Sequence, residues 1–182
     1  MTIPTVYLIR HAMPEQPYSG RYDLPPGPSL SDAGRQQADQ LGQFLQDKGI
    51  THLYHSPLQR TVETAAVVAD YLQRPSQQHA ALAEWRQGES AAAVRQRVVQ
   101  FWQETVLANG TGSAAAIITH GGLIDQLLGY LSEGQIDLSQ HRYWGGPSAP
   151  PAGVWLAQQQ PDNQWQLTLV FNPDGRDQSH NR

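Results

Sequence analysis

The chain has 182 residues with 39% hydrophobic and 15% charged residues, a composition typical of one globular domain with a sizeable core. Its formal net charge of −4 argues against general nucleic-acid binding, and the absence of cysteine excludes disulfides, thiolate catalysis and cysteine-type zinc sites. Because no run approaches the roughly 20 apolar residues of a membrane span and the first residues do not resemble a signal peptide, we expect a cytoplasmic protein that does not bind membranes.

The first third of the chain alternates strand-like and helix-like segments. Residues 5–10 are apolar and β-branched with few polar breaks, which is typical of a buried strand. The Pro- and Gly-rich residues 12–30 predict a long loop. Ser31 is a plausible N-cap for the helix that follows, and Gly49 is a suitable stop signal for it. A short strand is expected at 51–56.

The same alternation continues through the middle of the chain. Ser56 and Pro57 resemble an N-cap followed by a proline at the first helical position, so a helix is expected to start there. Another helix is expected at about 90–108. A buried strand at 114–120 is followed directly by a helix over 121–131.

Two strands joined by a turn are expected near the carboxyl terminus, at 152–158 and 164–172. The aromatic run at 141–146 is expected to pack against the sheet, and residues 176–182 belong to a polar tail. The pattern predicts an α/β fold: a three-layer α/β/α sandwich whose mostly parallel central sheet has helices on both faces, with antiparallel strands at the carboxyl terminus.

Polar side chains stand where three of the predicted strands end. The first strand ends at Arg10 and His11, the second ends just before the helix that carries Arg60, and the third ends at His120, which Gly121 follows. Ligands of such sheets bind outside the carboxyl ends of the parallel strands. We therefore expect two histidines and two arginines to meet at one edge of the sheet.

Such a cluster suits a phosphoryl group. Arginines hold phosphoryl oxygens through rigid two-pronged contacts, and the N–H groups of the helix start behind His120 add a site for an anion. A histidine can take the phosphoryl group on a ring nitrogen and pass it to water. The chain contains neither GxxxxGK[ST] nor H-E-x-x-H, so neither a P-loop nor that type of zinc site is expected.

Four segments, taken in order, resemble the histidine phosphatase superfamily, also called phosphoglycerate-mutase-like. They are "LIRHA" at 8–12, "SPLQRTVETA" at 56–65, "LAEW" at 82–85 and "IITHGGLI" at 117–124. The resemblance runs from about residue 5 to about residue 172, and it implies a single catalytic domain over 1–175.

The resemblance also implies a role for each matching polar residue. His11 would be the phosphorylated nucleophile, and Glu84 would be the proton donor. Arg10, Arg60 and His120 would bind the phosphoryl oxygens. The family's reaction uses no metal or cofactor, so none is expected here.

The identity of the general acid remains open at this stage. A carboxyl that donates a proton near neutral pH needs a raised pKa, which burial of Glu84 against Trp85 would supply. Glu89 is an alternative, because it lies only a few residues further on. Two acids of the 12–30 loop, Glu15 and Asp23, are further alternatives.

The chain departs from many relatives after Glu84. Those relatives insert a long segment that caps the site before a "GES" motif, whereas here that motif, at 88–90, follows within a few residues. We therefore expect an open site with Glu89 close to Glu84. Arg21, in the preceding loop, is a further candidate for contact with the substrate.

These features predict a phosphomonoesterase that hydrolyses a phosphate monoester, either a phosphorylated small molecule or a phosphoprotein, through a phosphohistidine on His11. One alternative is a phosphoglycerate-type mutase, although a site without a cap is poorly suited to excluding water. The other is a non-catalytic phosphate-binding or scaffold protein on the same fold, which would need no nucleophile. The sequence does not indicate an oligomeric state.

Overall fold

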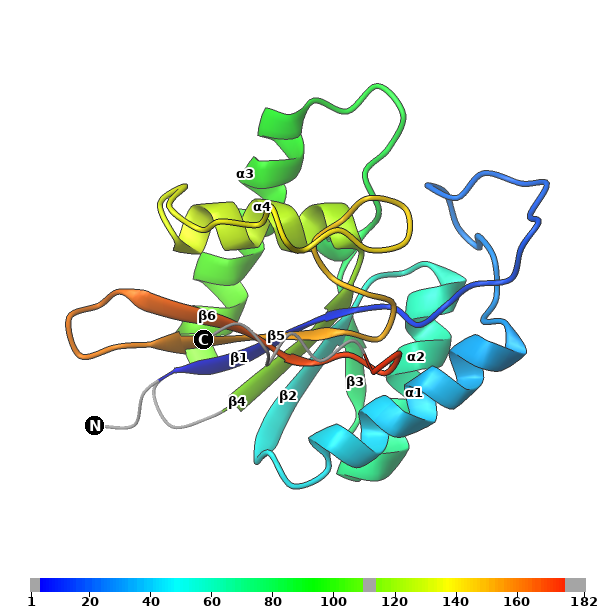
Figure 1. Cartoon of the computed structure of the whole chain (residues 1–182), viewed down its shortest axis with the longest axis horizontal. Helices are drawn as coiled ribbons and strands as arrows, with labels where there is room; N and C mark the ends of the chain where they lie inside the picture. Colours follow the sequence, from blue (N-terminus) through cyan, green and yellow to red (C-terminus); the bar gives the residue numbers. More distant parts are fainter. Residues whose placement is uncertain (1–3, 110–113, 176–182) are drawn as a thin grey trace.

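A six-stranded sheet forms the centre of the computed structural model, which describes residues 4–109 and 114–175 (Figure 1). Its strands are β1 (Thr5–Arg10), β2 (Ile50–His55), β3 (Ser76–Gln78), β4 (Ala114–Thr119), β5 (Val154–Gln159) and β6 (Trp165–Phe171), in the order β3-β2-β4-β1-β5-β6. The first four strands pair in parallel, and β5 and β6 pair antiparallel. The predicted sheet is confirmed; the expected tail at 176–182 lies outside the described residues.

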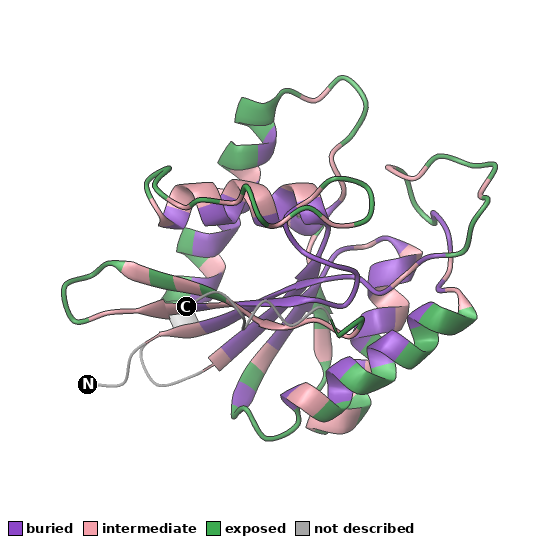
Figure 2. Ribbon diagram, viewed as in Figure 1, coloured by how far each residue is buried: buried purple, intermediate pink, exposed green. Residues whose placement is uncertain are grey.

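Four helices cover the two faces of this sheet, and they are α1 (Asp32–Leu45), α2 (Gln59–Leu72), α3 (Ala91–Phe101) and α4 (Gly121–Leu131). Helices α1 and α2 lie on one face and α3 and α4 on the other (Figure 1). Strand β1 shows why: Val6 and Leu8 pack with the α3–α4 side, while Tyr7 and Ile9 pack with the α1–α2 side. Alternate residues of a strand point to opposite faces, so a strand that is apolar throughout must be covered twice. Figure 2 shows the sheet buried between the two layers.

The helix ends agree with the sequence pattern at α1 but not at α2. The Ser31 hydroxyl accepts a hydrogen bond from the Gly34 N–H at 3.0 Å, which confirms the predicted N-cap. The predicted start of the second helix at Ser56 was wrong, because α2 begins at Gln59 with Leu58 as an N-cap that makes no side-chain bond. The Ser56 hydroxyl instead faces His120.

The segment between β2 and β4 is less regular than the sequence indicates. The expected helix at about 90–108 is α3, capped by Ser90 and extended by a π-helical turn (Trp102–Val106) and a 3₁₀ turn (Leu107–Asn109). Another 3₁₀ turn, Ala80–Leu82, precedes the loop that carries Glu84. None of the helices in the described part of the chain is long and apolar enough to cross a membrane.

Strand pairing places the ends of three strands side by side. Both β1 and β2 pair with β4, with Arg10 opposite Thr119 and His55 opposite Ile118. Hydrogen bonds continue one residue beyond the strands: the His11 N–H donates to the Thr119 carbonyl at 2.9 Å. The residues that follow these strands therefore start from neighbouring, fixed backbone positions.

Candidate active site

The polar residues at the three strand ends come together as a buried cluster. The exposed fraction is 4% for Arg10, 3% for His11, 1% for Arg60 and 0% for His120. The imidazole centroids of His11 and His120 are 5.3 Å apart. Charged and titratable groups are rarely buried unless they are paired or serve a function, so this cluster is the candidate active site.

The Arg60 guanidinium lies at the centre of the cluster. Its Nε donates to Nε2 of His11 at 3.1 Å, and its Nη2 donates to Oε2 of Glu84 at 3.1 Å. The same Nη2 lies 3.1 Å from Nδ1 of His120. One side chain near the start of α2 therefore contacts three groups that come from three other segments.

The His11 imidazole has a defined arrangement of its two nitrogens. Its Nδ1 lies 2.8 Å from the Ala12 carbonyl oxygen, which can only accept, so Nδ1 carries the proton. Nε2 then has a lone pair, which accepts the Arg60 Nε–H. Burial, together with the charges of Arg60, His120 and Arg10, holds the pKa of His11 well below its ordinary value. His11 is thus a neutral imidazole with Nε2 available as a nucleophile.

Arg10 is fixed by the segment that precedes β5. Its Nη1 donates to the carbonyls of Trp144 at 2.8 Å and Ala149 at 2.9 Å, and its guanidinium carbon lies 5.3 Å from the centre of the Trp144 ring. The expected packing of the aromatic run on the sheet holds for His141, which contacts Trp155 of β5. Trp144 instead lines the candidate site.

Two arginine N–H groups in the cluster have no acceptor. Within the described residues, Arg10 Nε and Arg60 Nη1 are buried and make no hydrogen bond. A Cβ atom at Gly121 would lie 3.5 Å from Arg10 Nε, and one at Gly27 would lie 3.0 Å from Arg60 Nη1. Buried donors normally have acceptors, so these two cationic groups favour binding of an anion.

Glu84 reaches the cluster from the loop that follows β3. Its Oε2 lies 3.2 Å from His120 Nδ1, and its Oε1 accepts the Trp85 N–H at 2.9 Å. The prediction of a raised pKa was wrong in direction. Burial does raise it, but the attraction and hydrogen bond of His120 and the charge of Arg60 outweigh burial and hold the pKa of Glu84 well below its ordinary value. The resting carboxyl is therefore ionised.

Glu89, the first alternative acid, is engaged elsewhere. Its two oxygens accept hydrogen bonds from Arg97 of α3, at 2.7 Å from Nε and 3.0 Å from Nη2. The loop acid Glu15 is exposed. Of the proposed acids, only Glu84 has a printed contact with the histidines of the cluster.

The 12–30 loop lies next to the Glu84 segment. Asp23 accepts the Gln87 N–H at 2.9 Å and pairs with Arg21, whose Nε lies 2.9 Å from Asp23 Oδ1. Arg21 is thus paired with a loop acid rather than with the cluster. The Tyr22 ring lies 5.8 Å from the guanidinium carbon of Arg60. Because of these contacts, the 12–30 loop flanks the site on the side where the open site was expected.

Sequence reasoning missed two hydroxyls that support the cluster. The Ser56 hydroxyl lies 2.7 Å from His120 Nε2, and the Thr64 hydroxyl accepts the Ala12 N–H at 3.1 Å. The signal for Ser56 was its position at a strand end, like that of His11. A capping serine and a strand-end serine look alike in sequence, so this signal did not distinguish the two roles.

The ligand atoms of His11, Glu84 and His120 lie within 4.8 Å of one another, a spacing that suits a metal ion. The Arg60 guanidinium contacts all three residues, however. A cation held between them would face this positive charge at close range. The donor set therefore fits an anion better than a metal ion.

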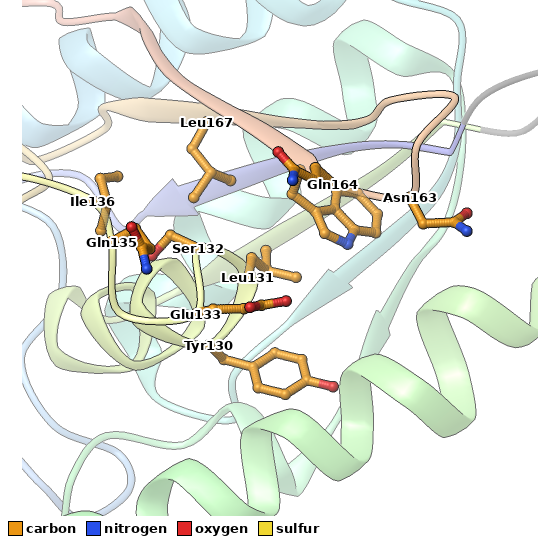
Figure 3. Close-up of a pocket in the computed structure, with 10 residues that line it drawn as sticks. Tyr130, Leu131, Ser132, Glu133, Gln135, Ile136, Asn163, Gln164 and Leu167 are labelled. Atoms are coloured by element: carbon orange, nitrogen blue, oxygen red, sulfur yellow. The ribbon is translucent and has the colours of Figure 1, made fainter.

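A separate cavity of about 710 Å³ lies between the carboxyl end of α4 and the β5–β6 hairpin (Figure 3). Its lining includes Tyr130, Ser132 and Trp165, and it includes none of the candidate site residues. This cavity opens at the other end of α4 from His120, so it is distinct from the candidate active site.

A family model for the histidine phosphatase superfamily (branch 1) matches this chain over residues 6–88 and 84–172. Two curated proteins match over a shorter stretch. The chain is 42% identical over 65 residues to a probable phosphoglycerate mutase GpmB of Erwinia tasmaniensis, and 41% identical over 63 residues to phosphoserine phosphatase 1 of Hydrogenobacter thermophilus. These matches cover 36% and 35% of this chain and 30% of each relative's length.

Solved structures share the fold over nearly the whole chain. YhfR of Bacillus stearothermophilus aligns with a TM-score of 0.73 at 21% identity, covering 92% of this chain and 96% of its own. A phosphoglycerate mutase from Bacillus anthracis str. Sterne aligns at 0.75 with 17% identity, covering 95% of each chain. A phosphoserine phosphatase from Entamoeba histolytica aligns at 0.72 with 17% identity, covering 93% of this chain and 98% of its own.

Proposed function

This chain belongs to the histidine phosphatase superfamily, and from that premise we propose that it is a phosphomonoesterase that works through a phosphohistidine on His11. Its substrate is a phosphate monoester, carried by a small molecule or by a protein. Relatives named phosphatase and relatives named mutase both match the chain, so membership alone leaves this choice to the chemistry of the site.

One observation carries the proposal. The lone pair of neutral His11 lies in the same buried cluster as two arginines that each keep an N–H without an acceptor. A phosphoryl group needs this combination: cationic donors for its oxygens and an uncharged nitrogen to attack its phosphorus. A protein that only bound phosphate would gain nothing from the lone pair.

In the first step, Nε2 of His11 forms a bond to phosphorus while the bond from phosphorus to the ester oxygen breaks. Arg10, Arg60 and His120 hold the phosphoryl oxygens, so Arg60 exchanges its contact with His11 Nε2 for one with the phosphoryl group. The leaving oxygen takes a proton from Glu84. The products are an alcohol and phosphohistidine.

Glu84 acquires that proton through the substrate. The resting carboxylate is stabilised by Arg60 and His120. A phosphoryl dianion that binds to the same two groups weakens this stabilisation and adds a neighbouring negative charge. Both effects raise the pKa of Glu84 in the complex, so the carboxyl is ionised in the free enzyme and protonated when substrate is bound.

In the second step, water attacks the phosphorus of the phosphohistidine. The Glu84 carboxylate left by the first step takes a proton from this water, and the bond between His11 and phosphorus breaks. Inorganic phosphate leaves, and His11 regains its lone pair. We propose that no metal takes part, since Arg60 supplies the positive charge within the group of possible ligands.

The test is a turnover screen over small phosphate esters, phosphopeptides and phosphohistidine protein, with His11→Ala as the blank. Release of inorganic phosphate that depends on His11 supports the phosphomonoesterase. Transfer of the phosphoryl group between positions of one substrate without its release would favour the mutase. Binding of phosphate without either reaction would favour the scaffold protein.

A further inference from the structure

We propose that Ser56 is a positioning residue that fixes the tautomer of His120, so that His120 presents an N–H to the phosphoryl group. The inference rests on the proposed function, because it deepens the role of His120 in binding that group. It begins with the backbone around Ser56, which lies just beyond the end of β2.

The Ser56 backbone is held on both sides. Its N–H donates to the Ile118 carbonyl of β4 at 3.1 Å, and its carbonyl accepts the Thr61 hydroxyl at 2.8 Å. Nδ1 of His55 lies 2.8 Å from the same carbonyl. Ser56 is 0% exposed, so its side chain has no water-facing alternative. The hydroxyl is therefore directed by a rigid frame rather than by its own preference.

The hydroxyl lies 2.7 Å from Nε2 of His120. It also accepts the Leu58 N–H at 3.3 Å, at the start of α2. A serine hydroxyl has one proton to donate, and here the accepting side is already used by Leu58. The hydroxyl proton is thus free to point at His120 Nε2, which makes Nε2 the acceptor.

The consequence appears at the other ring nitrogen. If Nε2 accepts, the neutral His120 carries its proton on Nδ1, which lies 3.2 Å from Glu84 Oε2. A carboxylate oxygen can only accept, so this contact agrees with an N–H at Nδ1. Burial lowers the pKa of His120, although Glu84 opposes this, so the ring is neutral rather than doubly protonated.

The opposite tautomer would be unsuited to the reaction. It would place a lone pair at Nδ1, facing both the carboxylate and the position where phosphoryl oxygens would bind. A histidine whose orienting partner is lost can adopt this wrong tautomer, and the reaction then slows although no contact with the substrate has been removed. Ser56 prevents this by holding Nε2 as an acceptor.

The test is ¹⁵N NMR of the histidine ring nitrogens in the resting protein near neutral pH, with the His120 signals assigned through His120→Asn. We expect a protonated Nδ1 and an unprotonated Nε2 in the unaltered protein. In Ser56→Ala we expect His120 to populate the Nε2–H tautomer, with kcat about ten- to hundredfold lower and KM little changed. Ser56→Thr, which keeps the hydroxyl, should restore the original tautomer.

The matched control is Ser132→Ala, which removes a serine hydroxyl at the far end of α4 and should leave both the His120 signals and kcat unchanged. A proton on Nε2 in the unaltered protein, or an unchanged tautomer in folded Ser56→Ala, would overturn the proposal. Because the spectra need no turnover, they separate it from the proposed function: a protein with the expected tautomer but no phosphatase activity would refute only the latter.

Discussion

Nε of Arg60 lies 3.1 Å from Nε2 of His11, so in the resting protein the nucleophilic lone pair is covered by the guanidinium that would bind the phosphoryl group. The contact holds the imidazole in one orientation, with Nδ1 bonded to the Ala12 carbonyl. It also means that substrate does not need to form the site. The phosphoryl group has only to exchange places with the existing contact between Arg60 and His11.

Replacement of His11 by Ala should abolish turnover without unfolding the protein, because it removes the lone pair that attacks phosphorus. Rapid quenching of the unaltered enzyme at high pH, where phosphohistidine survives, should trap labelled phosphate on His11. Full activity in the variant would refute the covalent role, and a normal circular-dichroism melt would exclude loss of fold as the cause of inactivity.

Replacement of Arg60 by Lys should lower kcat/KM by about 1–3 kcal/mol, the range for hydrogen bonds to charged groups. Lysine keeps the charge but loses the planar fork that contacts His11, Glu84 and His120 together. The measurement is steady-state kinetics, with the exposed Arg35→Lys on α1 as the matched control. Equal kinetics for Arg60→Lys and the unaltered enzyme would mean that the geometry of the fork is irrelevant.

Replacement of Glu84 by Gln should slow an alkyl phosphate far more than p-nitrophenyl phosphate in the phosphorylation step. An alkoxide needs a proton as it leaves, whereas an electron-poor phenolate does not. Transient kinetics on both esters measure this dependence. The matched control is Glu89→Gln, because Glu89 is bonded to Arg97 and should show no such dependence. A leaving-group effect confined to the Glu89 variant would assign the acid to Glu89.

The free energy of unfolding should fall as the pH drops from about 7 to about 5. The pKa values of His11 and His120 in the folded protein lie below the ordinary 6.5, because burial disfavours the imidazolium. Below that ordinary value the unfolded chain binds more protons than the folded one, so acid favours unfolding, by at most about 1.4 kcal/mol per pH unit for each histidine. Above about pH 7 both states are neutral at these two positions, and their contribution is constant.

Urea unfolding at a series of pH values measures this slope. The slope should become shallower in His11→Asn, and His52→Asn on β2, outside the cluster, serves as the control. An equal slope in His11→Asn and the unaltered protein would mean that His11 is not held neutral by the fold. The depressed pKa of Glu84 adds a further loss of stability only at lower pH, below the ordinary carboxyl value.

Treatment with EDTA should leave turnover unchanged, because Arg60 supplies the positive charge at the point where His11, Glu84 and His120 would bind a metal. The measurement is initial rate before and after chelation, with each divalent metal then added back. Inhibition by EDTA that a divalent metal reverses would contradict the metal-free mechanism.

Local pattern was sufficient to predict most of the fold, because each main strand is an apolar run and each helix carries an apolar stripe. It failed at β3, whose three polar residues, Ser76–Gln78, form a strand only because they pair with the edge of β2. It failed again at Ser56, where a capping motif and a strand end overlap. In both cases the deciding partner is distant in sequence: His120 lies 64 positions from Ser56.

The sequence by itself determined which residues stand at the strand ends, since Arg10, His11 and His120 each interrupt or follow an apolar run, and parallel strands must end at the same edge. Only the tertiary structure decided what these residues do to one another. The pKa of Glu84 is depressed rather than raised because Arg60 and His120 lie within hydrogen-bond distance of its carboxylate. Composition sets how many charges a chain has, but their pKa values depend on distances and burial that exist only once the chain has folded.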